Sequence, residues 1–489
     1  MKIINFSEIK EFLFENKAVK QTIFKNTFWS ALEIVINRVS KLVLLIYVAR
    51  ILGATEYGKF TFALAFVSLF VFIYDPGLSK IITREFSRDQ DKREEFYSVL
   101  SLKFILTLIA FLAIFIGSFL ITPDSQIQRI ILILALFSLA NGFISTFYAF
   151  FQARQRMEHE SWAETFQSVL CMVLGFLVLF RMPSVENLSY AYLGSALAAL
   201  VFILILFQNN NFPLKISWRK EVWFDFLKMS WPLAFTGLFT TIFAYIDSVL
   251  MGHWGMITET GWYNAAHKLI FISLIPMDII SGSFYPVLSS FFHESKEKMQ
   301  RIWDYQMEIM ILLGFPLVVG GFVLAGPIIN SIYSQGFEAS IKAFQILIFA
   351  AGISFVIRPF FDGLIASHHQ KQTLLATFWG ALINIVLNFM LIPRYSLYGA
   401  AAAMVITYFL VFLIYCFYAS KYTFIRIFSP QFLRALLLAG LSSFLMYLTV
   451  KQPWVFSLNA FFSIAIGSAV YLASLLLFNS ANKLSKKPN

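Results

Sequence analysis

Long apolar runs separated by short polar segments dominate the chain. A hydrocarbon core about 30 Å thick requires about 20 mostly apolar residues per helix, and fourteen runs of this kind can be counted. The pattern predicts an all-α protein that crosses a membrane about fourteen times. Clear runs cover 99–121, 127–150, 188–207, 304–326, 398–418 and 455–477, and more polar runs cover 26–50, 59–81, 162–181, 229–252, 262–284, 340–364, 372–392 and 432–450.

The composition agrees with a membrane protein and excludes a soluble enzyme. Of 489 residues, 59% are apolar, 18% are aromatic and 13% are charged, whereas soluble domains carry roughly 25% charged residues. The net charge is +11. The Lys and Arg residues of the chain lie between apolar runs rather than on one surface, which argues against nucleic-acid binding. Cys171 and Cys416 lie within apolar runs without metal or redox spacing, so we expect them to be small core residues.

The distribution of Lys and Arg predicts the orientation in the membrane. When the N-terminus is placed in the cytoplasm, most basic residues fall on the cytoplasmic side, which is the bias that sets topology. Both termini are therefore predicted to be cytoplasmic. The outer loops keep only Arg50, Lys59, Arg129, Arg181, Arg394 and Lys451.

A weak internal repeat suggests two lobes. The first run ends in Arg50-Ile51-Leu52-Gly53 and the seventh in Gly252-His253-Trp254-Gly255, and each is followed by a short outer turn and a returning helix. Parallel repeats of this kind occur in transporters. The predicted plan is an interfacial amphipathic segment at 1–25, an N-lobe at 26–210, a cytoplasmic linker at 211–228, a C-lobe at 229–420, two further helices within 421–480 and a basic cytoplasmic tail at 481–489.

Ionisable residues inside the predicted spans mark candidate sites, because each costs about 2.5–3.5 kcal/mol to insert. At 100° per residue, one arc of the first helix carries Glu33, Asn37, Arg38 and Lys41, opposite an apolar face. Two cations against one anion predict a water-facing surface with surplus positive charge. The alternative is that Glu33 forms a structural bridge with Arg38 or Lys41, or that Lys41 snorkels to the interface.

The eighth run repeats this arrangement. One arc of this run carries Asn264, His267, Lys268 and Asp278. We therefore expect each lobe to offer basic and polar groups to a central cleft. A positive cavity of that kind suits an anionic head group.

Two aspartates are candidates for ion coupling, because a buried carboxylate can carry a proton or bind Na⁺. Asp247 lies on one face of the seventh run with two threonines, and Asp75 lies on a polar face of the second run. Alternatively, Asp247 caps or pairs with a nearby cation. Asp75 precedes Pro76-Gly77, so it alternatively ends its helix at the cytoplasmic face.

The tenth run carries a local charge pair beside a proline. Arg358 and Asp362 are spaced i, i+4, which is typical of an ion pair on one helix, and Pro359 between them predicts a kink. We expect a hinge or a bridge there. His368 and His369 lack further ligands at metal spacing, and no catalytic triad or carboxylate pair stands out, so neither a metal site nor an enzyme is predicted.

Three groups of motifs occur in a characteristic order along the chain. Together they span most of the chain. The first group is Arg50-Ile51-Leu52-Gly53-Ala54-Thr55-Glu56-Tyr57-Gly58 with Asp75-Pro76-Gly77-Leu78 and Thr83-Arg84-Glu85. The second group is Tyr245-Ile246-Asp247-Ser248-Val249-Leu250-Met251-Gly252 with Gly261-Trp262-Tyr263-Asn264-Ala265-Ala266-His267-Lys268-Leu269 and Pro286-Val287-Leu288-Ser289. The third group is Asn384-Ile385-Val386-Leu387-Asn388 with Ile392-Pro393-Arg394-Tyr395-Ser396-Leu397-Tyr398-Gly399-Ala400-Ala401.

In their order and spacing, these motifs resemble the Wzx-type polysaccharide biosynthesis flippases of the multidrug/oligosaccharidyl-lipid/polysaccharide exporter superfamily. The resemblance implies a MATE-like fold, with two six-helix lobes around a V-shaped central cleft and a C-terminal helix pair. It implies a bacterial inner-membrane flippase that moves an undecaprenyl-diphosphate-linked oligosaccharide to the outer leaflet by alternating access. No cofactor is expected, and the energy would come from a H⁺ or Na⁺ gradient or from substrate flow. Glycan polymerase or ligase machinery would be a partner, and nucleic acid would not.

The resemblance also carries over individual residues. The cleft cations of the first and eighth helices would be Arg38, Lys41 and Lys268, whereas the basic residue that commonly follows the seventh-helix aspartate is here Ser248. A lipid II flippase and a MATE-type drug antiporter are rival functions on the same fold. The positive first-helix face argues against a cationic drug. A membrane glycan ligase or polymerase is less compatible with the short outer loops.

Overall fold

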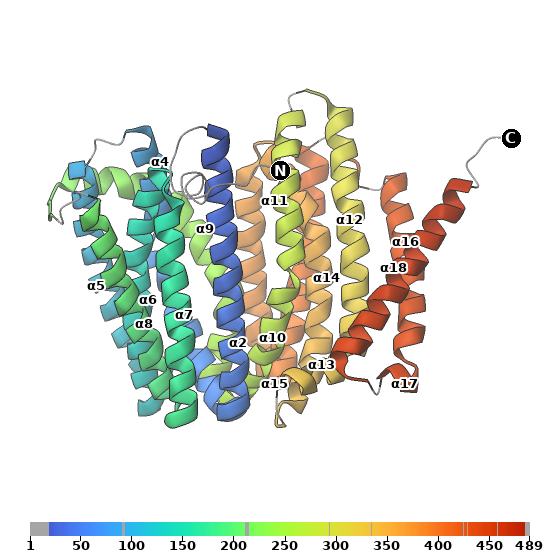
Figure 1. Ribbon diagram of the computed structural model, residues 1–489, viewed down its shortest axis with the longest axis horizontal. Helices are drawn as coiled ribbons and strands as arrows, with labels where there is room; N and C mark the ends of the chain where they lie inside the picture. Colours follow the sequence, from blue (N-terminus) through green and yellow to red (C-terminus); the bar gives the residue numbers. More distant parts are fainter. Residues whose placement is uncertain are drawn as a thin grey trace, which may run out of the picture. The chain divides into compact units, whose positions relative to one another are not determined.

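The structure is a computed structural model in which every regular element of the described residues is a helix (Figure 1). Residues 1–18 of the predicted segment 1–25 and residues 485–489 of the predicted tail 481–489 lie outside the described residues. The structure describes residues 19–89, 93–210, 215–292, 294–333, 335–423, 425–427, 429–456 and 458–484.

Twelve helical segments of the described chain are long and apolar enough to cross a membrane. Two of them, Leu32–Arg88 and Gln370–Tyr422, have 57 and 53 residues. A straight helix of that length would measure about 80 Å, far more than the hydrocarbon core. Each instead turns back at a residue with non-helical backbone angles, Gly53 in one and Ser396 in the other. Counting each as two spans gives fourteen, which confirms the predicted all-α membrane protein.

The chain divides into two compact units between Tyr245 and Ile246, within α9 (Lys220–His253). The predicted lobes and the cleft between them stay predictions. Part of the predicted linker is helical from Lys220 onward. Its Trp223 indole donates to the carbonyl of Ser98 at 2.8 Å, and Phe226 is buried in the first unit.

In the first unit, α6 packs against α2, α4, α5 and α8, and α7 packs against α2 and α8. Aromatic side chains fill much of this core: the rings of Phe96, Phe150 and Phe207 lie 4.5 to 5.7 Å apart. Besides the first part of α9, its helices are α2 (Val19–Ser68), α3 (Val71–Tyr74), α4 (Leu78–Arg88), α5 (Arg93–Ile121), α6 (Ser125–Ala153), α7 (Met157–Arg181) and α8 (Val185–Asn209).

In the second unit, α14 is the central helix and contacts α10, α11, α12, α13 and α15, while α16 packs on α12 and α18 on α16. Trp303 anchors this core, because its indole donates to the carbonyl of Pro359 at 3.0 Å and its ring packs on Phe360. Its helices are α10 (Ile257–Ser273), α11 (Ile275–Phe292), α12 (Lys296–Val323), α13 (Ala325–Ile332), α14 (Glu338–Ala366), α15 (Gln370–Tyr422), α16 (Pro430–Val450), α17 (Pro453–Phe456) and α18 (Ala460–Leu484).

A glycine with a positive φ lies at the first outer turn of each half of the predicted repeat. Gly53 joins the first two spans of unit one and Gly255 joins α9 to α10, and both have φ of 77°. This left-handed backbone region favours glycine. The sequence repeat at these two positions therefore corresponds to a shared positive φ.

Candidate functional site

Four groups of charged and polar side chains within the described spanning helices, two in each unit, contain most of the predicted site residues. We call them the Glu164 cluster, the Lys103 pair, the Asp247 cluster and the Arg358 network. Each is held by residues from at least two helices, because a polar group that leaves water must find partners elsewhere in the protein.

The Glu164 cluster joins α2, α6 and α7. Asn37 donates to Oε1 of Glu164, the hydroxyl of Tyr148 donates to Oε2 at 3.4 Å, and Nζ of Lys41 lies 3.9 Å from Oε1. The side chain of Glu164 is 20% exposed and that of Lys41 is 56% exposed. Lys41 is thus an accessible cation, and among the described residues the carboxylate within ion-pair distance of it comes from another helix.

Carboxylates outnumber cations around this group. Glu160 accepts two contacts of 2.9 Å from the amide of Gln152, and Glu33 lies close enough to interact with Glu160, Glu164 and Lys41. Arg38 is exposed and has no ion-pair partner in the part of the chain that the structure describes. The surplus of positive charge predicted from one helix is therefore offset once the glutamates of α7 are included.

The Lys103 pair lies where the second span breaks between α3 and α4. Lys103 of α5 is fully buried, and its Nζ lies 3.5 Å from Oδ2 of Asp75 and 5.6 Å from the ring centre of Tyr74. Asp75 also accepts hydrogen bonds from the hydroxyls of Ser79 at 2.7 Å and Ser145 at 3.3 Å. Asp75 thus ends α3, as one of the two alternatives expected, and is also half of an intramembrane ion pair.

The Asp247 cluster holds a carboxylate with neutral donors only. Oδ1 of Asp247 accepts from the backbone N–H and the hydroxyl of Ser248, at 2.6 and 3.3 Å, and Oδ2 accepts from the hydroxyl of Tyr263. Asn264 extends the cluster by donating to the Ser248 hydroxyl at 3.0 Å. Asp247 is 2% exposed and has no cation within ion-pair distance among the described residues.

His267 belongs beside this cluster. Its ring stacks on Tyr263 with centres 5.5 Å apart, and its buried Nε2 has no hydrogen bond within the described part of the chain. Lys268, the next residue, is half-buried. The predicted arc on the eighth run therefore separates in space. Asn264 contacts Ser248 and His267 contacts Tyr263, the two hydrogen-bond partners of Asp247, while Asp278 joins another group beyond the break at Leu274.

The Arg358 network links α11, α12 and α14. Nε of Arg358 donates to Oγ of Ser281 at 2.7 Å and lies 3.3 Å from Oδ1 of Asp362, and one terminal nitrogen lies 3.4 Å from Asp278. Asp362 also accepts from Ser281 at 2.6 Å and from Gln306 at 2.7 Å. The i, i+4 pair predicted from sequence is present, and it is one part of a three-helix network.

The helix α14 runs through Pro359 without non-helical backbone angles. The predicted hinge at this position stays a prediction. The Trp303 indole that donates to the Pro359 carbonyl comes from α12, so the proline is also a contact between helices.

Sequence reasoning missed several of these residues. Glu160 and Glu164 are spaced i, i+4 near the start of the fifth run, and Lys103 is a single cation within one of the clearest apolar runs. Both patterns were visible signals, since ionisable residues in spans are rare. Gln306 carried no comparable signal, because a neutral amide near the start of a run is ordinary.

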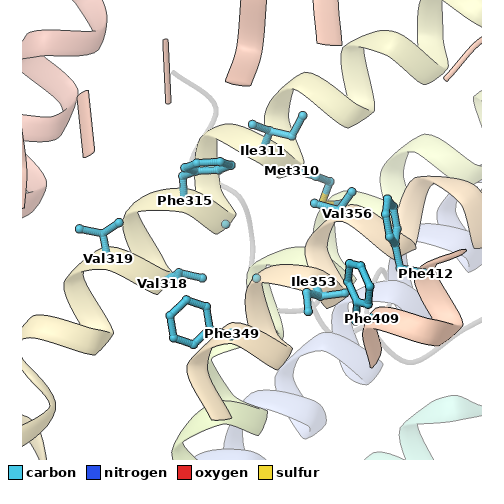
Figure 2. A pocket seen from close by; sticks show the side chains of 12 residues that line it. Met310, Ile311, Phe315, Val318, Val319, Phe349, Ile353, Val356, Phe409 and Phe412 are labelled. Carbon is cyan, nitrogen blue, oxygen red and sulfur yellow. The ribbon is translucent and has the colours of Figure 1, made fainter. Parts of the chain in front are cut away.

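An apolar cavity of about 470 Å³ lies in the second unit between α12, α14 and α15. Figure 2 shows its lining, in which Phe349, Ile353 and Phe409 carry no polar side-chain atom. Val356 lines the cavity, and Arg358 lies roughly 200° further around α14 at 100° per residue. The cavity is therefore on a different face of α14 from the Arg358 network and offers no hydrogen-bonding chemistry.

The spans and their internal charges define a multi-pass integral membrane protein with the general construction of a transporter. The chain belongs to the polysaccharide biosynthesis protein family, whose pattern matches residues 23–292, more than half of the sequence. This confirms the family resemblance inferred from the motifs.

Individual relatives and solved structures agree with this assignment. The chain is 20% identical over 396 residues to the capsular polysaccharide biosynthesis protein CapF of Staphylococcus aureus, covering 79% of this chain and 96% of CapF. It is 22% identical over 440 residues to the lipid II flippase MurJ of Bacillus subtilis, covering 79% of this chain and 80% of MurJ.

Two solved structures show the fold. A lipid II flippase MurJ in an inward closed conformation superposes with a TM-score of 0.77 at 15% identity, covering 94% of this chain and 99% of that one. An inward-facing multidrug resistance MATE transporter gives a TM-score of 0.64 at 16% identity, covering 80% and 97%. The predicted MATE-like fold is confirmed.

Proposed function

We propose that this protein is a flippase that moves a polyprenyl-diphosphate-linked oligosaccharide from the cytoplasmic to the outer leaflet of a bacterial inner membrane by alternating access. The observation that carries the proposal is membership of the polysaccharide biosynthesis family on a fold shared with a lipid flippase. Accessible cations within spanning helices fit a charged head group, and the prenyl tail would remain in lipid. Both termini would be cytoplasmic, and the product would pass to glycan polymerase or ligase machinery.

The head group would contact Arg38, Lys41 and Lys268. Arg38 and Lys41 are exposed side chains on one helix, and Lys268 is half-buried in the other unit. A diphosphate would compete with Glu164 for Lys41, because phosphate oxygens are strong acceptors for cationic donors. Glu164 would therefore act as an internal substitute for the substrate.

Asp247 would couple transport to a H⁺ or Na⁺ gradient. Its carboxylate is buried and bonded to neutral donors only among the described residues, so binding one cation there would neutralise a charge that the protein otherwise solvates alone. Asp278, Glu33 and Asp75 are weaker candidates for this role, because each lies beside at least one cationic side chain.

The test is accumulation of undecaprenyl-linked oligosaccharide, resolved by leaflet, in a deletion strain. The strain is complemented at matched expression with wild type or with Arg38→Ala, Lys41→Ala or Lys268→Ala. Build-up in the inner leaflet that only wild type relieves is the expected result. Rescue by every variant would remove the site assignment, and no build-up after deletion, with redundant flippases excluded, would remove the function.

One observation favours a second candidate, a MATE-type cation antiporter. The Glu164 cluster contains three carboxylates from two helices, and an acidic surface attracts a cationic substrate. The same deletion strain separates the two functions: an antiporter would leave the glycolipid distribution unchanged and would increase sensitivity to cationic dyes.

A further inference from the structure

We propose that Arg358 is an anion-binding residue of the second unit, and that Asp278 is an internal carboxylate that occupies it until a phosphate-bearing ligand arrives. The ligand class rests on the proposed function. The role of Arg358 itself is argued from the contacts of α11, α12 and α14.

One edge of the Arg358 guanidinium is fixed from the protein interior. Its Nε donates to Ser281 and faces Asp362, and Gln306 holds Asp362 from a third helix. Ser281 is 1% exposed, Gln306 is fully buried and the side chain of Asp362 is 3% exposed. Three helices thus hold one arginine in a defined orientation, which lowers the entropy lost when it binds a ligand.

The other edge of the guanidinium remains accessible. The side chain of Arg358 is 30% exposed, and Asp278 reaches only one terminal nitrogen, at 3.4 Å. The second terminal nitrogen has no hydrogen-bond partner in the described ranges. Since a guanidinium carries five N–H donors in a planar fork, at least two donors remain to bind an oxyanion.

Asp278 has the properties of a displaceable partner. Its side chain is 45% exposed, so releasing it to water costs little, whereas Asp362 is enclosed. It lies in the first turn of α11, where a helix favours a negative charge. A phosphate at this position would replace one carboxylate contact by a two-oxygen contact to the arginine fork.

A structural staple between α11 and α14 is the competing explanation, and binding measurements separate the two. Full-length protein in phosphatidylcholine nanodiscs is titrated calorimetrically with inorganic pyrophosphate. Asp278→Asn is expected to tighten binding about threefold or more, and Arg358→Lys to weaken it about tenfold by removing the fork. Lys298→Gln, which disrupts an exposed pair with Glu294, should leave the affinity unchanged.

Removing Arg358 alone would leave Asp362 buried without its cation, and this could destabilise the fold. The neutral double variant Arg358→Gln with Asp362→Asn removes both charges, so the test does not depend on that effect. It should abolish the gain given by Asp278→Asn. An affinity that Asp278→Asn leaves unchanged or weakens, or that Arg358→Lys leaves unchanged, would overturn the proposal.

Two competitors identify the source of the phosphate. Displacement of pyrophosphate by undecaprenyl diphosphate would support the substrate as ligand, and displacement by phosphatidylglycerol alone would support a bulk lipid head group on the same arginine. Because binding is measured without transport, a negative result here removes the Arg358 site and leaves the flippase proposal to the deletion strain.

Discussion

The Lys103 pair gives the sharpest quantitative prediction, because its two partners are unequally supported. Asp75 keeps three hydrogen-bond contacts if Lys103 is removed, two from Ser79 and one from Ser145. Among the residues that the structure describes, Lys103 keeps only the ring of Tyr74 if Asp75 is neutralised. The two single substitutions should therefore differ in cost, although each breaks the same ion pair.

Breaking a buried ion pair by removing one partner costs about 3–5 kcal/mol. Lys103→Met should fall near the lower end, at about 3 kcal/mol, because charge-assisted hydrogen bonds continue to stabilise the carboxylate. Asp75→Asn should reach about 5 kcal/mol, because it leaves a fully buried ammonium without an anion. The double variant removes both charges and should cost less than either single variant.

The assay is the free energy of unfolding in mixed micelles, obtained by titration with a denaturing detergent. Lys298→Gln on the exposed end of α12 serves as a control that should change little, since exposed pairs contribute under about 1 kcal/mol. If the cost of the double variant equals the sum of the two single costs, the charges are not coupled. The reasoning from burial would then fail.

Two further predictions concern the backbone and the core of each unit. Gly53→Ala and Gly255→Ala should each cost about 1–2 kcal/mol in thermal denaturation, because a Cβ meets open space at both positions but the φ of 77° is unfavourable for it. Gly237→Ala, also in open space but inside the helix α9, should be neutral or stabilising in the same measurement. Trp303→Phe should cost about 1–3 kcal/mol by leaving the Pro359 carbonyl without its indole donor, and a melting temperature equal to wild type would contradict this.

Most of the fold followed from the apolar runs, because a bilayer leaves few alternatives to a helix for a span of that length. The runs also located the turn at Gly53, where two glycines flank a short polar stretch. They did not show that each break is confined to a single residue with non-helical backbone angles, Gly53 in α2 and Ser396 in α15, since backbone angles at one residue leave no mark on hydropathy.

The candidate site was less predictable, because its partners come from different helices. The polar arc of the first helix was visible, whereas its neutralisation by Glu164 depends on α7 lying against α2. Likewise, Asp278 and Arg358 were assigned separate roles in the sequence and lie in one network in the structure. Angular position on one helix predicts which side chains share a face, and it does not predict what that face meets.

The buried lysine also has a consequence for how the chain enters the membrane. α5 contains the most apolar of the twelve candidate spans, and on biological insertion scales about six to ten strongly apolar residues offset one lysine. The segment can therefore be accepted by the insertion machinery before Lys103 has met Asp75. The apolar excess of α5 thus allows the helix to insert before its ion pair forms. Substitutions that lower this excess should therefore prevent insertion of α5 rather than disturb its packing after insertion.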